Sequence, residues 1–357
     1  MLTIIQGKGT LPREQAGRNI HYDDASLSNY KKFEQGDFII HLRSFEGGLE
    51  MANEAGIVSP AYTILRCKRP HSSLFYDAYF HTDEFINHNL SKSVEGIRDG
   101  RQISYEAFKW LGIPYCEPTE QEKISTLFSA FNERIAKQRD LVESLKKYKR
   151  GLSKAVFSTN SELFPKSTVA SLGELFPFIR NGFVGTVTPF FTSQENGVRY
   201  LQGTNIHDGK ISDETAFYVT QAFNQKHSKN ILKSNDILVV QSGHVGECAV
   251  VGDNYAGSNC HALIIMSNGG ECASDYICQY INSDDGKKKI AAITTGNTIK
   301  HILATSIANI EVPLPSKKDQ QRIAELLNSW DNRIEQEIRN LCKLVRIKEG
   351  LLQQLFI

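Results

Sequence analysis

Apolar residues recur every three or four positions along two long stretches of the chain, residues 113–157 and 313–357. The recurrence averages about 3.5 residues, which is the period of helices that wind around one another in a coiled coil. Each stretch therefore predicts a long helix with one apolar stripe, and we expect the two stripes to face each other in an antiparallel seam. The predicted seam positions are Ile124, Phe128, Phe131, Ile135, Val142, Leu145, Ile323, Leu327, Trp330, Ile334, Leu341 and Leu344.

The two stretches are copies of one another, displaced by 199 residues. Aligned identical residues include Gln121 with Gln320, Ile135 with Ile334, Gly151 with Gly350 and Phe157 with Phe356. Both stripes are also interrupted by polar residues at the same two places. The interruptions are Gln138 with Glu337 and Lys149 with Lys348. A polar residue in a seam weakens the seam but selects its register, and shared interruptions indicate an internal repeat rather than two unrelated core helices.

The segments that precede each helix contain short apolar runs bounded by turn residues, as at 36–40 and 235–240. Such runs predict strands in both segments. The displacement of 199 persists there, aligning Asp37 with Asp236, Ile39 with Leu238 and Ile64 with Leu263. We therefore expect a mixed α/β (α+β) chain in which a globular unit followed by a long helix occurs twice. The expected segments are a globular unit at 1–112, a helix at 113–157, a linker at 158–166, a globular unit at 167–312 and a helix at 313–357.

The two globular segments differ at their start. Residues 167–199 have no counterpart in the first segment, because residue 1 already aligns with residue 200. We therefore expect the first globular unit to lack its opening strand. A unit without that strand would expose a sheet edge and part of its core.

Bulk composition excludes several classes of protein. The formal net charge of +1 means that any nucleic-acid site must be a local patch. The seven cysteines include no CxxC pair, so free thiols in a cytoplasmic protein are expected. Cys260-His261 has no second pair at ligand spacing, and we expect no metal site. No apolar run reaches the roughly 18 residues of a membrane span.

Motifs for catalysis are also absent from the sequence. It contains no GxxxxGK[ST] or GxGxxG loop for nucleotides, and no GxSxG or HExxH motif for hydrolysis. The scattered acidic residues show no paired spacing typical of acid–base chemistry. We therefore expect the chain not to be an enzyme.

Polar residues in the predicted loops could instead contact DNA. Arg and Lys match the O6 and N7 acceptors of guanine, and Asn and Gln can pair with N6 and N7 of adenine. Such residues also line many solvated loops. The candidates in the first unit are Arg13, Gln15, Arg18, His41, Arg43, Arg98, Arg101 and Gln102. Those in the second unit are Arg180, Asn181, Gln202, Asn205, His207, Gln241, Ser242, His244, Lys287 and Lys300.

A set of motifs in fixed order resembles the specificity subunit of type I restriction–modification systems. The matching pieces of the second half are Val312–Pro315, Gln320–Ile323, Asp331–Ile334, Lys348–Phe356, Asn235–Gly243, Leu172–Leu175 and Thr295–Ile299. Those of the first half are Gly36–Phe38 and Ser59–Tyr62. The resemblance covers essentially the whole chain, and it is more specific in the helices than in the globular segments.

The resemblance implies a non-catalytic, sequence-specific DNA-binding subunit with two target recognition domains, each reading one half of a bipartite site. The antiparallel helices would act as a spacer that docks two methyltransferase subunits, and these would associate with restriction and translocase subunits. S-adenosylmethionine, ATP and Mg²⁺ would bind those partners rather than this chain. The complex would act in DNA methylation and phage defence. Residues at equivalent places on the two helices would face outward for docking, namely Gln121, Arg134, Gln320 and Arg333.

Two alternatives stay open at this stage. If the first unit is incomplete, the chain could be a truncated or decoy interaction protein that binds methyltransferase subunits but reads DNA poorly. A nuclease or methyltransferase fused into the chain is the second alternative, and the missing motifs argue against it.

Overall fold

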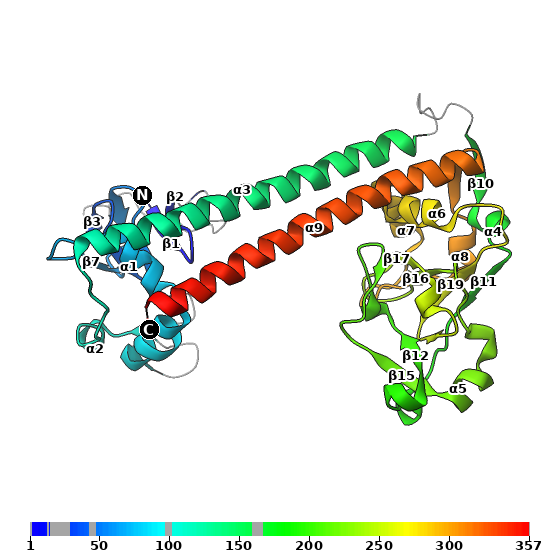
Figure 1. Ribbon diagram of the computed structural model, residues 1–357, viewed down its shortest axis with the longest axis horizontal. Coiled ribbons are helices and arrows are strands. Elements are labelled where there is room, and N and C mark those ends of the chain that lie inside the picture. Colours follow the sequence, from blue (N-terminus) through cyan, green and yellow to red (C-terminus); the bar gives the residue numbers. More distant parts are fainter. Residues whose placement is uncertain are drawn as a thin grey trace. The chain divides into compact units, whose positions relative to one another are not determined.

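The computed structural model describes residues 2–12, 14, 29–42, 48–96, 102–158 and 167–356. They divide into two compact units, residues 1–141 with 337–357 and residues 142–336. Each unit contains one globular part together with parts of two long helices, α3 (Pro118–Val156) and α9 (Lys317–Leu355) (Figure 1). Within the described ranges, no helix has the length and apolar character that crossing a membrane requires.

The globular part of the second unit is built around a four-stranded antiparallel sheet in the order β11-β19-β16-β17. These strands are β11 (Phe178–Asn181), β16 (Ile237–Val240), β17 (Cys248–Val250) and β19 (Leu263–Ser267). A second sheet contains β12 (Gly197–Leu201), β15 (Phe217–Thr220) and β18 (Asn259–Cys260). Two further sheets have two strands each, β10 (Thr168–Ser171) with β20 (Glu311–Leu314) and β13 (Ile206–His207) with β14 (Lys210–Ile211). The shorter helices are α4 (Leu172–Leu175), α5 (Gln221–Lys226), α6 (Ser274–Asn282), α7 (Asp284–Ile293) and α8 (Ala304–Ala308).

The globular part of the first unit has a three-stranded sheet in the order β5-β4-β7. These strands are β4 (Phe38–Ile40), β5 (Leu49–Met51) and β7 (Thr63–Leu65). The remaining pairs are β1 (Leu2–Ile5) with β2 (Gly9–Pro12), β3 (Lys31–Phe33) with β6 (Gly56–Val58), and β8 (Val94–Glu95) with β9 (Gln102–Ile103). Its α-helices are α1 (Ser73–Phe80) and α2 (Tyr105–Phe108), and a π-helix (Glu84–Asn89) and a 3-10 helix (Leu90–Ser93) lie between them.

The two central sheets share one register, as the internal repeat predicts. Phe38 on β4 lies opposite Met51 on β5, and Ile237 on β16 lies opposite Val250 on β17. Each residue of the second pair lies 199 positions after its counterpart in the first pair. The duplication therefore extends from the helices into the pairing of individual strands.

The third strand of each sheet departs from that displacement. Ile39 lies opposite Ile64 in the first unit, whereas Leu238 lies opposite Ile265 in the second. Ile64 therefore corresponds to Ile265, and its expected alignment with Leu263 is wrong by two residues. The second unit has two more residues in the connection before this strand. It also has a fourth strand, β11, that has no equivalent among the described residues of the first unit.

A buried aspartate closes the same turn before each central strand. The Asp37 carboxylate accepts the backbone N–H of Glu34 at 2.7 Å, and the Asp236 carboxylate accepts that of Lys233 at 3.0 Å. The residue before each aspartate has positive φ, +87° at Gly36 and +67° for the asparagine of the second unit. Glycine and asparagine tolerate this left-handed conformation better than other residues, so both copies keep the turn with different residues.

The two long helices pair in antiparallel fashion, as their shared period predicts. In the first unit, Gln138 Nε2 donates to Glu337 Oε2 at 2.8 Å, and the rings of Phe128 and Phe356 lie 6.3 Å apart. Residue numbers thus rise along α3 as they fall along α9. In the second unit, the ring of Tyr148 lies 4.7 Å from that of Trp330. All twelve predicted seam residues are buried or half-buried.

A buried glutamine ties the start of each long helix to the globular part that precedes it. Gln121 Oε1 accepts the N–H of Ser72 at 2.9 Å, and Gln320 Oε1 accepts the N–H of Ala273 at 2.9 Å. The side-chain amide of each glutamine also donates to a carbonyl just before its own helix. Both side chains are at most 2% exposed. The expectation that these two glutamines face outward is therefore wrong.

A phenylalanine at the end of each long helix packs into the core of a globular part. The ring of Phe356, which directly follows α9, lies 5.0 Å from that of Phe75 on α1. The ring of Phe157, which directly follows α3, lies 5.5 Å from that of Tyr276 on α6. Each globular part is therefore held by the beginning of one long helix and the end of the other.

We expect Phe356→Ala to lower the free energy of unfolding of the first unit by about 3–5 kcal/mol, the usual cost of emptying a buried aromatic site. Hydrogen exchange of the α1 amides measures that loss, and the α6 amides of the second unit should stay protected. Leu355→Ala is the matched control, because Leu355 is 43% exposed. Equal deprotection by the two variants would contradict the anchoring role of Phe356.

Candidate functional site

Most of the DNA-contact candidates of the first unit lie outside the described residues. They are Arg13, Gln15, Arg18, Arg43, Arg98 and Arg101. Gln102 is exposed on β9. His41, in contrast, is only 5% exposed, and its Nε2 lies 3.5 Å from Oε1 of Glu50. His41 belongs to the core of the first unit, and the expectation of a surface contact is wrong for it.

The Glu50 carboxylate, 1% exposed, organises the polar interior of the first unit. It accepts the backbone N–H groups of Gly7 and Gly9 at 2.9 and 3.0 Å, and His81 Nε2 lies 3.3 Å away. Burial alone would raise the pKa of Glu50, but the contacts with His41, His81 and Gly7 lower that pKa to about 2. Burial would likewise lower the pKa of His81, but its contact with Glu50 and a nearby aspartate raise it to about 9. The carboxylate therefore fastens the β1–β2 turn to the core as one member of a charged pair.

The stability of the first unit should depend on pH on both sides of neutrality. Glu50 stabilises the fold above its unfolded pKa of about 4.3, and this contribution, on the order of 3 kcal/mol, is lost as pH falls toward 2. His81 stabilises the fold below its unfolded pKa of about 6.5, and this contribution is lost as pH rises through 9. We expect maximal protection of the Gly7 and Gly9 amides between about pH 4.5 and 6.5, measured by hydrogen exchange.

Glu50→Gln is the variant that checks this assignment. It removes the carboxylate charge but keeps the shape of the side chain, so both limbs of the pH profile should flatten. A variant that kept the same pH dependence as the parent chain would show that other groups cause it.

In the second unit, the structure brings several candidates together on one surface. The β16–β17 turn, residues 241–247, lies beside the loop at 294–301, because Ile302 N–H donates to Gln241 O at 3.1 Å and Ser242 forms a bridge with His301. A cavity of about 500 Å³ lies between this turn and α7. Its lining includes His244, Lys287 and Lys300. We call the exposed residues Ser242, His244, Lys287 and Lys300, with His207, the loop surface.

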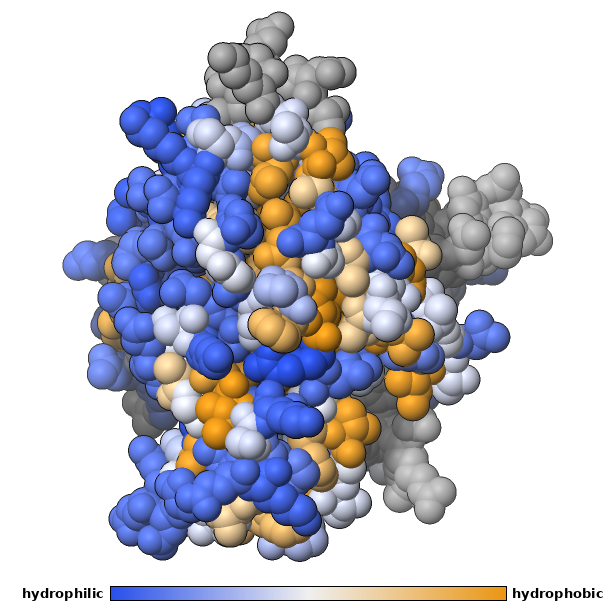
Figure 2. Space-filling model, turned by 90° about the vertical axis from the view of Figure 1, so that its right-hand side faces the viewer, coloured by the Kyte–Doolittle hydropathy of each residue, from blue (hydrophilic) through white to orange (hydrophobic). Residues whose placement is uncertain are grey.

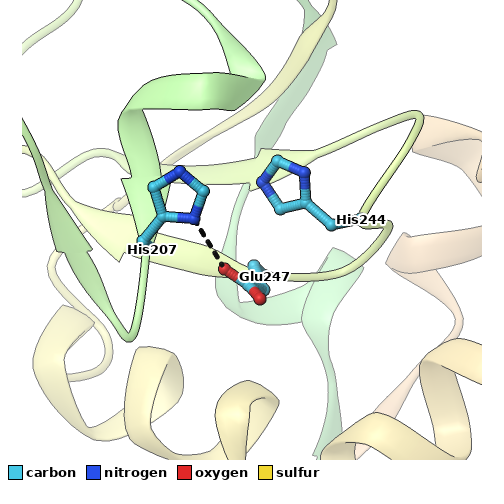
Figure 3. Close-up of side chains that lie close together, drawn as sticks. All are labelled: His207, His244 and Glu247. Atoms are coloured by element: carbon cyan, nitrogen blue, oxygen red, sulfur yellow. Dashed lines mark ion pairs between the residues drawn. The ribbon is translucent and has the colours of Figure 1, made fainter. Parts of the chain in front are cut away.

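His207 reaches the loop surface from the neighbouring hairpin. It lies on β13, and its ring stacks on that of His244 with centroids 5.1 Å apart and planes 18° apart (Figure 3). Both rings are exposed. The two histidines are 37 positions apart in the sequence, so only the fold places them in contact.

Two glycines shape the turns that carry these residues. Gly246 has φ +91°, and a Cβ there would lie 2.4 Å from Cγ2 of Ile290 on α7. Gly296 has φ +97°, and a Cβ there would lie 2.2 Å from the carbonyl oxygen of Ile299. Any other residue would strain the backbone and push neighbouring atoms away. Ile299, at the tip of the 294–301 loop, is 70% exposed and takes no part in the core.

A basic cleft adjoins the loop surface at α7. Its cavity of about 290 Å³ lies between the end of α3 and helices α6 and α7. Five basic side chains and two acidic ones line it, namely Lys149, Arg150, Lys154, Lys287, Lys288, Asp284 and Asp285. Lys287 lines both the cleft and the cavity of the loop surface. Sequence reasoning missed Arg150 and Lys154, because these α3 residues meet Lys287 only through the fold, and it also missed Lys288, which follows Lys287 in the sequence.

Two further candidates of the second unit have structural roles. Asn205 is fully buried, and its side-chain amide donates to the carbonyl oxygens of Ser212 and Thr215 at 3.0 and 2.7 Å. The expectation of a DNA contact is wrong for Asn205. Arg180 on β11 donates to Lys229 O at 2.7 Å and to Ser267 Oγ at 2.6 Å, so its guanidinium is held against the sheet. Asn181 is exposed, and Gln202 and Gln241 are half-buried.

Exposed apolar side chains also occur on the side of the second unit that carries β10, β11 and α8. They include Val169, Phe178 and Leu303, which are 55%, 68% and 50% exposed. Figure 2 views this side and shows apolar surface among hydrophilic surface. Apolar side chains do not neutralise phosphates, so the loop surface and the basic cleft are the better candidates for a nucleic-acid interface.

Sequence comparisons place the chain among known proteins. A family model described as the type I restriction modification DNA specificity domain matches residues 162–343. The chain is 24% identical over 335 residues to the type I restriction enzyme MjaVIII specificity subunit of Methanocaldococcus jannaschii, covering 90% of this chain and 78% of that protein. It is 24% identical over 271 residues to the putative type I restriction enzyme MjaX specificity subunit of the same organism, covering 71% and 60%.

Solved structures share the fold at lower sequence identity. The crystal structure of the type I restriction–modification system S subunit from M. genitalium matches with a TM-score of 0.60 and 16% identity, covering 92% of this chain and 84% of that one. A structure that addresses complex assembly and conformational transition of the type I R-M system matches with a TM-score of 0.57 and 16% identity, covering 91% and 82%.

Proposed function

The chain belongs to the type I restriction–modification DNA specificity family, and from this premise we propose that its two globular parts each read one half of a bipartite DNA site. It is a specificity subunit, which provides DNA target recognition within a type I complex. The subunit is not catalytic, and the cofactors of the complex reside on the methyltransferase and restriction subunits.

The observation that carries the proposal is the duplication of the globular part down to its strand register. Phe38 opposite Met51 and Ile237 opposite Val250 occupy the same place in two sheets. Two copies of one reading element on a single chain suit a target with two separate parts. Linking two readers makes the second binding event intramolecular, so two modest contacts give high overall affinity.

We assign DNA contact in the second unit to the loop surface and the basic cleft. The cleft supplies lysine and arginine side chains for phosphates, which position the protein without reading sequence. The polar side chains of Gln241 and Ser242, on the adjoining turn, are suited to base edges. Lys287 lines both regions and would join the phosphate contacts to the base contacts.

We expect Lys287→Ala to weaken DNA binding by the assembled complex for all sequences alike, and to reduce the slope of log affinity against log salt by about 1. Lys226→Ala is the matched control, because Lys226 is also exposed but lies at the end of α5, away from the loop surface. Fluorescence anisotropy over a salt series measures both quantities. An unchanged affinity and slope for Lys287→Ala would remove the basic cleft from the interface.

The long helices carry a repeated outward face that supports two docking surfaces. On α3, Leu127 is 40% exposed between exposed Lys123 and Arg134. On α9, the equivalent positions carry Leu326, which is 41% exposed, between exposed Arg322 and Arg333. Neither leucine contributes to the seam. An apolar residue that recurs in the same exposed, basic setting is better explained by a repeated partner than by folding.

We infer that each face binds one methyltransferase subunit, and that restriction subunits join the complex through them. Leu127→Asp or Leu326→Asp should each reduce the number of bound methyltransferase copies from two to one, because a charge replaces an apolar contact. The double variant should bind none. Native mass spectrometry of the reconstituted complex counts the copies.

Leu141→Asp is the control for the docking variants. Leu141 is 39% exposed on α3, but Asn340 stands at the equivalent place on α9, so its environment is not repeated. This variant should keep both methyltransferase copies. Retention of two copies by the Leu127→Asp, Leu326→Asp double variant would refute the docking proposal without affecting the DNA-contact assignment.

A further inference from the structure

Two histidines and a glutamate converge at the edge of the loop surface. His207 comes from β13, and His244 and Glu247 come from the turn between β16 and β17. One ring nitrogen of each histidine and one carboxylate oxygen of Glu247 all lie within 4.8 Å of one another. Figure 3 shows the three side chains turned toward a common centre.

The hydrogen bonds of His207 determine which of its nitrogens is available. Nε2 lies 2.9 Å from the carbonyl oxygen of Thr204, and a carbonyl can only accept, so Nε2 carries the hydrogen. In the neutral ring, Nδ1 then has the lone pair, and it lies 3.8 Å from Oε2 of Glu247. A histidine that donates its other N–H to a backbone carbonyl is the usual arrangement of a metal ligand.

Glu247 presents the second lone pair to the same centre. Its Oε2 is enclosed by protein atoms and has no hydrogen-bond partner among the described residues. Two acceptor atoms that face each other repel unless a cation or a proton lies between them. His244 Nε2 lies 3.2 Å from the carbonyl oxygen of Ile206, so in the neutral ring Nε2 carries the hydrogen and Nδ1 has the lone pair.

We propose that His207, His244 and Glu247 bind a divalent transition-metal ion, with Zn²⁺ the best fit. Imidazole nitrogens suit Zn²⁺, Ni²⁺, Cu²⁺ and Fe²⁺, whereas Mg²⁺ and Ca²⁺ prefer oxygen ligands throughout. Three protein ligands leave one position of a tetrahedron for water or for another oxygen ligand.

The three candidate ligand atoms lie within 4.8 Å of one another, which can be compared with the spacing that such a site requires. Zn–N and Zn–O bonds of about 2.0–2.2 Å place tetrahedral ligand atoms about 3.3–3.6 Å from one another. The 3.8 Å between His207 Nδ1 and Glu247 Oε2 is slightly longer than this. Small rotations of three side chains close the remaining gap, and two of the three are exposed and free of core packing.

A metal at this centre would hold together the two turns that carry the loop surface. His207 belongs to the β13–β14 hairpin, and the other two ligands belong to the β16–β17 turn. Lys287 and Lys300 line the adjoining cavity and would repel a cation. The single carboxylate of the ligand set offsets part of the metal's charge. Because its ligands come from two separate turns, the role we assign to the metal is to stiffen these turns. The inference does not depend on DNA recognition, and its test uses no DNA.

The test is metal binding by the full chain, with the exposed free thiols Cys67 and Cys342 changed to serine so that they do not bind metal. After removal of metals by a chelator, Zn²⁺ is titrated in competition with a chromophoric chelator. We expect one Zn²⁺ per chain, and we expect His207→Ala, His244→Ala and Glu247→Gln each to weaken binding about ten-fold or more. Zn²⁺ should also raise the Tm of the parent but not of these variants.

Two controls make the result specific. His88→Ala removes an exposed histidine of the first unit and should leave Zn²⁺ affinity unchanged. Co²⁺ in place of Zn²⁺ distinguishes the ligands, because thiolates add a charge-transfer absorption that nitrogen and oxygen ligands lack. A Co²⁺ thiolate band would assign binding to cysteines, for example the buried Cys248 and Cys278, whose sulfurs are 3.5 Å apart, and would overturn the proposal. Absence of Zn²⁺ binding would also overturn it.

Discussion

The joining of each globular part to two different helices is the constraint on which the rest of the molecule depends. Gln121 fixes the start of α3 and Phe356 fixes the end of α9 in the same unit, and Gln320 and Phe157 do so in the other. A glutamine is suited to the helix start because its amide accepts one backbone N–H and donates to one carbonyl, so no polar atom is buried unpaired. A phenylalanine is suited to the helix end because it adds apolar area to a core that is already aromatic.

The polar residues of the seam set how the helices slide against each other. Gln138 and Glu337 occupy the same place in the two copies, and they bond to each other. In an antiparallel pair only one position can face its own equivalent, so this contact marks the point at which the two copies cross. Glu337 is 6% exposed, and a shift by one helical turn would leave its carboxylate buried without Gln138. The cost of that shift, several kcal/mol, favours a single register.

Periodicity and repetition made much of this fold predictable. The apolar stripes located both long helices, and the displacement of 199 located the equivalent strands to within two residues. Side-chain direction was harder to predict, since His41 and Asn205 look like surface loop residues until the fold turns them inward. Gln121 and Gln320 gave the same difficulty, because a polar residue at a helix start has no apolar period to show which way it faces. Contacts such as His207 with His244 join separate hairpins, and no local pattern encodes them.

The placement of Phe356 also affects the order in which the protein can fold during translation. A ribosome synthesises the globular part of the first unit early, yet the aromatic side chain that completes its core follows only after the whole of residues 142–336. The core of the first unit must therefore stay incomplete while the second unit is synthesised. Long-range closure of this kind is slow and leaves apolar surface accessible to chaperones or to aggregation in the meantime. Loss of Phe356 would thus damage the half of the protein that was synthesised first.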